Sequence, residues 1–197
     1  MNEKPMNAKD ITIVMTKQLK ETIRNRANKE SPNEICFVIG GHLSKSDTHC
    51  RFLTTNVFFP EPDDYEIQHG GACRLNPEYL QRVLLYCAEN QLHIIYAHTH
   101  PFAGGLPHES STDLDAAAYM PAAISEACPG MLVMTMVASA DFEGIEAHVY
   151  RPSLKRRDPI DKLLVCERGK LDMLYPTSSV LRDAEAEMDE DYVSRLA

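Results

Sequence analysis

Two histidines in the segment His98-Thr99-His100-Pro101 have the spacing of a metal-ligand pair. Side chains alternate between the two faces of a β-strand, so His98 and His100 point the same way while Thr99 faces the other side. The proline that follows predicts that the strand ends there. The pair is therefore expected at the end of a strand, where an ion can be reached from solvent.

Asp113 is a candidate third ligand, because it lies at the expected start of a helix from which its carboxylate can turn back to the histidines. Two imidazoles and one carboxylate leave a position for water, which is typical of catalytic rather than structural zinc. Zinc held in this way can lower the pKa of water to about 7 and so supply hydroxide at neutral pH. The same segment also has a purely structural interpretation, since Ser110 is a good helix N-cap and Asp113 is favourable in a first turn. The two interpretations are compatible, because a capped first turn is a rigid place from which to present a ligand.

The elements that must position these residues are predicted from hydrophobic periodicity and from turn residues. A strand leading into an amphipathic helix is expected over 11–28. Further strands are expected at 34–41, 51–59, 92–100, 131–139 and 145–150, helices at 76–90 and from 110 to about 120, and a polar loop at 61–71. Pro121 is expected to break or restart the last helix. This order lacks regular β-α alternation and predicts an α+β fold, an α/β/α sandwich built on a mixed β-sheet.

The composition changes after residue 151, which predicts a core domain at 8–152 and a C-terminal extension at 153–197. Apolar segments at 163–166 and 171–175 predict a hairpin in the extension. The last sixteen residues, 182–197, hold six acids and two arginines. Such a charge run is usually a solvated helix face or a frayed tail, and a docking segment is the alternative.

The motifs resemble the signature of the JAMM (MPN-domain) metalloproteases, which is an upstream glutamate, then His-x-His-Pro, then Ser-x-x-Asp. The resemblance implies that His98, His100 and Asp113 bind one catalytic Zn²⁺. It also implies that Glu34 is the general acid/base and that Ser110 donates a hydrogen bond to the oxyanion. Without the family pattern, Glu34 would be taken for an ordinary surface residue before a strand.

The resemblance covers roughly residues 10–150 and implies an MPN-like fold, with the layout of the cytidine deaminases. The chain departs from the family pattern in the loop at 101–109, which is two residues longer than is common. A shifted register would make Asp115 the third ligand instead of Asp113. His108, in the same loop, could be a fourth ligand or a substrate contact, although a bystander role is favoured.

The resemblance further implies a zinc-dependent peptidase or isopeptidase that cleaves the bond after the C-terminus of ubiquitin or a ubiquitin-like protein. The compact size resembles bacterial members, some of which occur beside activating and conjugating enzymes in defence-associated pathways. The alternatives are a noncatalytic MPN scaffold, a sulfur-carrier-processing hydrolase, and a hydrolase of the family branch linked to DNA repair.

Composition excludes several other classes. The 197 residues carry 20 basic and 29 acidic side chains, a net charge of −9 with a pI near 5.3, which argues against nonspecific binding to nucleic acid or to anionic membranes. The six cysteines form no CxxC pair, so most are expected to be reduced core thiols. The N-terminal segment has no apolar signal region, and the longest nearly apolar run, 131–140, is too short for a bilayer. A cytoplasmic location is therefore expected.

Overall fold

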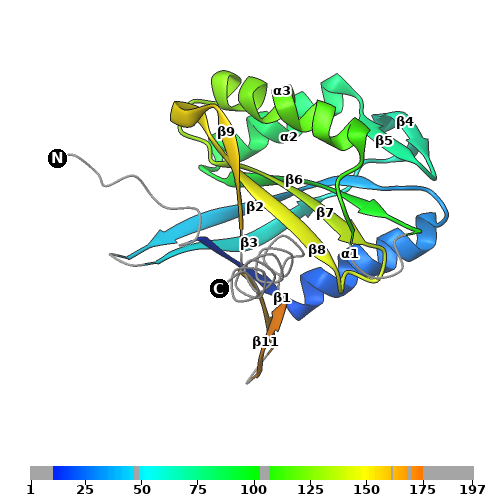
Figure 1. Ribbon diagram of the computed structural model, residues 1–197, viewed down its shortest axis with the longest axis horizontal. Coiled ribbons are helices and arrows are strands. Elements are labelled where there is room, and N and C mark those ends of the chain that lie inside the picture. Colours follow the sequence, from blue (N-terminus) through cyan, green and yellow to red (C-terminus); the bar gives the residue numbers. More distant parts are fainter. Residues whose placement is uncertain (1–10, 47–48, 103–106, 161, 168–169, 175–197) are drawn as a thin grey trace, which may run out of the picture.

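The computed structural model describes residues 11–46, 49–102, 107–160, 162–167 and 170–174. These residues form one large mixed β-sheet, a separate two-stranded sheet and three α-helices (Figure 1). The strands of the large sheet are β1 (Ile11–Thr16), β2 (Cys36–Lys45), β3 (Cys50–Phe58), β6 (His93–His100), β7 (Val133–Ser139), β8 (Ile145–Arg151), β9 (Arg156–Pro159), β10 (Lys162–Glu167) and β11 (Lys170–Leu174). Their order across the sheet is β11-β10-β1-β3-β2-β6-β7-β8-β9.

The helices cover both faces of this sheet (Figure 1). They are α1 (Lys17–Glu30), α2 (Pro77–Glu89) and α3 (Ser111–Ala127), with short 3-10 turns at Pro62–Asp64 and Pro152–Leu154. Ile23 and Ala27 of α1 belong to the core on one face, while Val83 of α2 and Ile124 of α3 belong to the core on the other. The fold is thus α+β, as the element order predicts, and a helix layer lies on each side of the sheet.

The central strands β2 and β6 are buried because they have neighbours on both sides and helices above and below. Residues 36–41 of β2 are all buried, as its continuous apolar run predicts. Thr16 caps α1 and Asn76 caps α2, in each case by accepting a hydrogen bond from a backbone N–H of the first turn. These local capping residues explain why the starts of the helices can be predicted from the sequence.

The expectation of a loop at 61–71 is wrong. The chain there forms β4 (Tyr65–His69), which pairs antiparallel with β5 (Ala72–Leu75) in the two-stranded sheet. Tyr65 and Ile67 are half-buried, with the exposed Glu66 between them. The strand has few apolar residues because this hairpin lies outside the large sheet, so its hydrophobic signal is weak.

The expected break at Pro121 is also wrong, because α3 continues from Ser111 to Ala127. A proline inside a helix removes one backbone hydrogen bond and crowds the preceding turn. Here Ala117, Pro121 and Ile124 are all buried along one face of the helix. Packing of that face against the sheet outweighs the intrinsic preference of proline, as tertiary contacts commonly do.

The hairpin expected in the C-terminal segment is present as β10 and β11, which pair antiparallel. β10 also pairs parallel with β1, and β9 pairs antiparallel with β8. The strands after residue 152 therefore extend the same sheet at both of its edges. The acidic tail at 182–197 lies outside the described residues.

None of the helices in the described part of the chain has the length and apolar character needed to cross a bilayer.

Candidate functional site

The two histidines of β6 point to the face of the sheet that carries α2 and α3. Ile94 of this strand belongs to the core under these helices, while Ile95 and Ala97 belong to the core on the α1 face. His98 and His100 are therefore on the α3 side, with their Nε2 atoms 3.1 Å apart. Thr99 faces the other way and is buried, where its Oγ1 accepts a hydrogen bond from the backbone N–H of Ile35.

Glu34 is brought to the histidines by the pairing of β2 with β6. Cys36 is opposite His98 in this antiparallel ladder, and continuing the register by two residues sets Glu34 opposite His100. Because side chains two apart share a face, Glu34 lies on the same face as Cys36. The Oε1 atom of Glu34 is 4.0 Å from Nε2 of His100, and the residue is only 7% exposed.

Ser110 and Asp113 reach the site from the first turn of α3, where they form a reciprocal capping box. The backbone N–H of Ser110 and its hydroxyl both donate to Oδ2 of Asp113, each at 2.7 Å. In return, Oγ of Ser110 accepts from the backbone N–H of Asp113 at 3.2 Å. These bonds fix the direction in which the aspartate carboxylate points.

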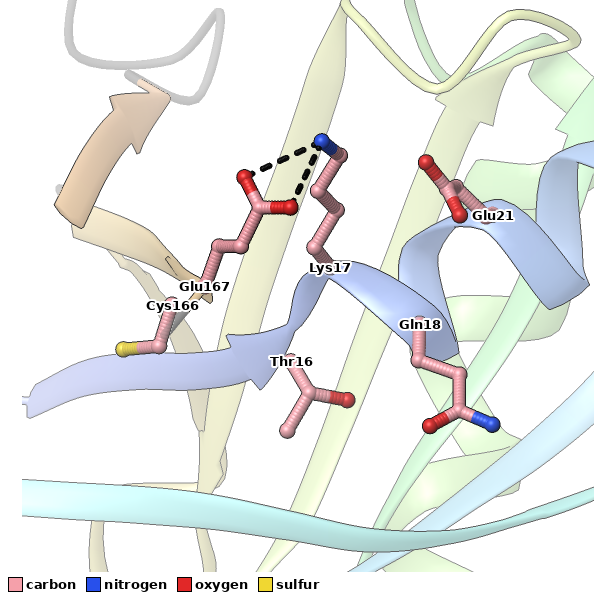
Figure 2. A pocket seen from close by; sticks show the side chains of 6 residues that line it. All are labelled: Thr16, Lys17, Gln18, Glu21, Cys166 and Glu167. Atoms are coloured by element: carbon pink, nitrogen blue, oxygen red, sulfur yellow. Dashed lines mark hydrogen bonds and ion pairs between the residues drawn. The ribbon is translucent and has the colours of Figure 1, made fainter. Parts of the chain in front are cut away.

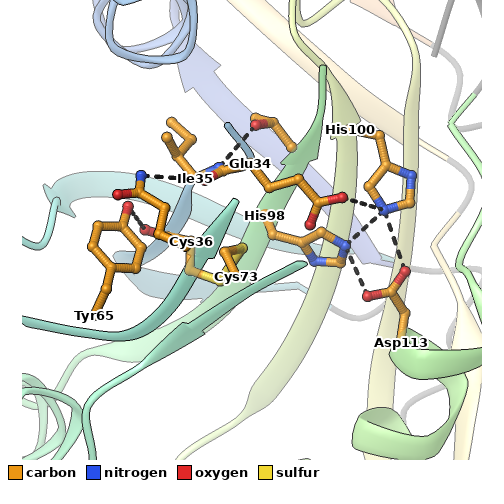
Figure 3. The surroundings of a disulfide bond; sticks show 10 residues. Glu34, Ile35, Cys36, Tyr65, Cys73, His98, His100 and Asp113 are labelled. Atoms are coloured by element: carbon orange, nitrogen blue, oxygen red, sulfur yellow. Dashed lines mark hydrogen bonds and ion pairs between the residues drawn. A yellow bond between two sulfur atoms is a disulfide. The ribbon is translucent and has the colours of Figure 1, made fainter. Parts of the chain in front are cut away.

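The carboxylate of Asp113 lies against both histidines (Figure 3). Its Oδ1 is 3.1 Å from Nε2 of His98, and its Oδ2 is 3.2 Å from Nε2 of His100. In a tetrahedral zinc site with bonds of about 2.0–2.1 Å, neighbouring ligand atoms are about 3.3 Å apart. The three side chains thus have the separations and donor types of a three-ligand metal site. The ligand atoms of Glu34, His98 and His100 also lie within 4.8 Å of one another.

The charges at the site favour a cation. The hydrogen bond to Asp113 raises the pKa of His100, against the effect of burial. Burial raises the pKa of Asp113, but the hydrogen bonds from His100 and His98 outweigh it and hold this pKa well below its usual range. Asp113 stays ionised next to the two histidines. A metal ion bound there can take the place of the proton on the histidine nitrogen that faces the carboxylate.

The β4–β5 hairpin holds the backbone of Glu34, a role that no sequence pattern predicts. The N–H of Glu34 donates to the carbonyl of His69 at 3.0 Å, and Nε2 of Gln68 donates to the carbonyl of Glu34 at 3.3 Å. One residue further, Ile35 is held by Thr99 on β6. The backbone around Glu34 is therefore held from both sides before any substrate is present.

A disulfide between Cys36 and Cys73 ties the same hairpin to β2 (Figure 3). The two cysteines are 37 residues apart in the chain and belong to no recognisable motif, so the sequence did not predict this pairing. The other four cysteines are thiols outside any disulfide, in line with the expectation that most are thiols: Cys50, Cys87, Cys128 and Cys166. The crosslink joins the hairpin to the strand that carries Glu34.

A groove of about 380 Å³ leads away from the histidines between the β4–β5 hairpin and α3. Its metal-site end contains His98 and Asp113. Its apolar lining includes Leu75, Leu80, Tyr96, Met120 and Met136. Its acidic lining comprises Glu66, Glu109, Asp113 and Asp115, whereas Arg74 is the one lysine or arginine among the described lining residues. An elongated ligand with apolar and basic groups would match this groove.

A scan against protein-family models and a search of curated proteins both find no match for this chain. One of the solved structures with a similar fold illustrates the likeness. It is the solution structure of protein DSY2949 from Desulfitobacterium hafniense, with a TM-score of 0.54 over 79% of this chain and 94% of that one. The two sequences are 18% identical, so this likeness shows the fold alone.

The two residues left open as alternative ligands have different surroundings. Asp115 is exposed and lines the same groove as Asp113. His108 faces β8 instead, with its Nδ1 3.7 Å from Oε2 of Glu146. Asp113 is the aspartate that contacts both histidines.

Glu109, Glu146 and His148 form a second group whose ligand atoms are close enough to hold an ion. Arg157 already supplies a positive charge there, because its guanidinium binds the carboxylate of Glu109. Burial, followed by the charge of Glu109, raises the pKa of Glu146. This group is better described as a polar network around an ion pair than as a metal site.

A larger hollow, of about 480 Å³, lies beside the start of α1 and the end of β10 (Figure 2). Its described lining contains no histidine, and Lys17 binds Glu167 across it at 3.0 Å. The candidate metal site is therefore in the smaller groove, which contains His98 and Asp113.

Proposed function

We propose that this chain is a zinc-dependent peptidase or isopeptidase of the JAMM type, acting on the bond after the C-terminus of ubiquitin or a ubiquitin-like protein. The observation that carries the proposal is the convergence of His98, His100 and Asp113, with ligand atoms 3.1–3.2 Å apart, beside Glu34 and Ser110. The separate helix layers on the two faces of a mixed sheet support the MPN-like fold that belongs to this proposal.

In the proposed mechanism His98, His100 and Asp113 hold the ion. Zn²⁺ in such a site supplies Lewis acidity toward a carbonyl and lowers the pKa of water. Glu34 accepts a proton at its buried carboxylate and returns it to the leaving amine. Burial raises the pKa of Glu34, against the lowering effect of His98 and His100, and a carboxyl with a raised pKa is suited to both steps.

Ser110 supplies a hydrogen-bond donor for the oxyanion that develops on the carbonyl oxygen. Its hydroxyl donates to Asp113 in this structure, so it lies in the first turn of α3 next to the proposed ligands. The hydroxyl has one proton, so it must turn from Asp113 toward the oxyanion during the reaction. Loss of one oxyanion donor typically costs about 3 to 4 kcal/mol of barrier. The hydrogen bond that Oγ of Ser110 accepts from the backbone N–H of Asp113 holds the oxygen in place while its proton turns.

The groove supports an extended polypeptide tail as the substrate. Strands β4 and β5 form one wall, and an extended chain can add to a strand edge through backbone hydrogen bonds. The apolar lining favours a tail with apolar side chains, and the exposed carboxylate of Asp115 favours a basic one. A tail bound along the groove would end at His98 and Asp113.

Metal analysis combined with a cleavage assay tests this proposal. The purified chain is expected to contain one Zn²⁺ and to release a reporter fused after the C-terminus of a ubiquitin-like protein, through a main-chain bond or through a lysine side chain. A chelator should abolish release and added Zn²⁺ should restore it. A chain that binds no metal and cleaves neither fusion would contradict the proposal.

The Ala116→Trp substitution is expected to block the groove without disturbing the metal site. Ala116 lines the groove from α3, and a bulky ring there would occupy the space of the substrate. We expect kcat/KM to fall by about tenfold or more, which corresponds to about 1.4 kcal/mol of lost transition-state binding, while zinc content is unchanged. Ala118, exposed on the same helix and outside the groove lining, gives the matched control Ala118→Trp. Equal losses in both variants would show that the groove does not bind the substrate.

A further inference from the structure

Arg157 of β9 connects three parts of the structure beside the start of α3. Its guanidinium donates two hydrogen bonds to the carboxylate of Glu109, from Nη1 to Oε1 and from Nη2 to Oε2, the second at 2.9 Å. Nη1 also donates to Oγ1 of Thr135 on β7, at 3.2 Å. A two-point contact of this kind fixes both the direction and the distance of the carboxylate. Glu109 is therefore held in one position relative to β7 and β9.

The Glu109–Arg157 pair is largely shielded from water, since the side chains are 7% and 16% exposed. Nδ1 of His148 is 4.0 Å from Oε1 of Glu109, and Glu146 belongs to the same cluster. If Arg157 were lost, Glu109 would keep a buried charge beside a second carboxyl group. Because an unpaired buried charge is strongly unfavourable, the carboxylate of Glu109 would move toward solvent and displace its own backbone.

The backbone of Glu109 leads directly into the candidate metal site, because the next residue is the N-cap Ser110. The N–H of the peptide bond that joins these two residues donates to Oδ2 of Asp113 at 2.7 Å. A shift of Glu109 therefore changes the orientation of the Ser110 backbone N–H, which helps to fix the carboxylate of Asp113. Ordered contacts thus run from Arg157 through Glu109 and Ser110 to the proposed ligand.

We propose that Arg157 is a positioning residue for the metal site, which acts by holding Glu109 and thereby the capping box that orients Asp113. The inference rests on the proposed function only in that His98, His100 and Asp113 must bind a metal ion. It gives a function to β9, which lies after the segment that resembles the JAMM family.

The metal affinity of the Arg157→Met variant tests this inference. Methionine keeps much of the side-chain volume and removes the guanidinium. Loss of a residue that bonds directly to a metal ligand typically weakens metal binding by about 10- to 100-fold. Arg157 acts through Glu109, so we expect a loss at the lower end of that range, about tenfold for Zn²⁺, measured on the full chain by competition with a chromophoric chelator. Melting curves of the metal-free proteins report stability separately.

Arg156 provides the matched control on the same strand. Its side chain is 64% exposed and pairs with Asp158 rather than with Glu109. The Arg156→Met variant is expected to bind Zn²⁺ like the unmodified chain. Weaker binding in Arg157→Met but not in Arg156→Met would support the inference.

A second variant keeps the test decisive if Arg157→Met does not fold. Arg157→Lys retains the charge but lacks the two-point fork, so it is expected to fold and to bind Zn²⁺ more weakly than the unmodified chain. If Arg157→Met folds and binds Zn²⁺ as tightly as the unmodified chain, the inference is overturned and the proposed function is left intact. If only Arg157→Lys folds, unchanged zinc affinity in that variant has the same meaning. An unmodified chain that binds no Zn²⁺ would overturn both.

Discussion

The Glu34→Gln variant is expected to lose nearly all hydrolytic activity while it keeps its metal. Glutamine has almost the same shape but cannot accept a proton, and general acid–base catalysis typically contributes about 10²- to 10⁴-fold to the rate. We expect kcat for cleavage of the modifier fusion to fall within that range, and KM to change little because the groove is unaltered. The metal should stay bound because the three proposed ligands remain in place. Steady-state kinetics and metal analysis on the same preparation check both parts.

Glu30→Gln is a suitable control for this experiment. Glu30 is the last residue of α1 and pairs with Arg26 one turn earlier, so it is a nearby glutamate with a structural contact outside the site. Its replacement should leave kcat unchanged. If Glu34→Gln were as active as the Glu30 variant, Glu34 would not be the general acid/base, whatever the metal content.

The parts of the site that could be predicted from the sequence depend on short-range patterns. The spacing of His98 and His100 fixes a common face on any strand, and the Ser110-to-Asp113 spacing gives a capped helix start by local chemistry alone. Glu34 is different, because its approach to His100 depends on the pairing of two strands distant in the chain. Glu34 could be predicted as a site residue only through the resemblance to a family signature.

The parts that could not be predicted depend on long-range contacts of residues with no distinctive local pattern. The β4–β5 hairpin is polar, and its hydrogen bonds to Glu34 follow from where it packs rather than from its own sequence. The ion pair between Arg157 and Glu109 joins residues 48 apart in the chain. A basic residue in an edge strand gives no sign of such a partner, since most charged side chains are simply solvated.

The Asp113→Asn variant is expected to bind metal far more weakly than the unmodified chain. The carboxylate of Asp113 lies 3.1 Å and 3.2 Å from the two histidine Nε2 atoms, and its charge is what balances a cation there. A neutral amide is a poorer ligand, so we expect zinc affinity to fall by more than the roughly 10- to 100-fold that follows loss of an outer partner. The chelator competition assay measures this loss, and activity at limiting zinc should fall in parallel. The metal-free fold should persist because the amide oxygen of asparagine can still accept the hydrogen bond from the backbone N–H of Ser110.

The Asp115→Asn variant distinguishes the two ligand assignments that the longer loop leaves open, with either Asp113 or Asp115 as the third ligand. Asp115 is exposed and lines the groove two residues after Asp113, so its replacement should leave zinc affinity unchanged. Its replacement is expected to affect the substrate instead, by raising KM for a basic tail, because it neutralises an exposed acid of the groove. The reverse result, with zinc lost from the Asp115 variant and kept by the Asp113 variant, would mean that the first turn of α3 rotates when metal binds. In that case the capping box would have to open before the site could fill, because the two hydrogen bonds from Ser110 to Oδ2 hold Asp113 as it stands.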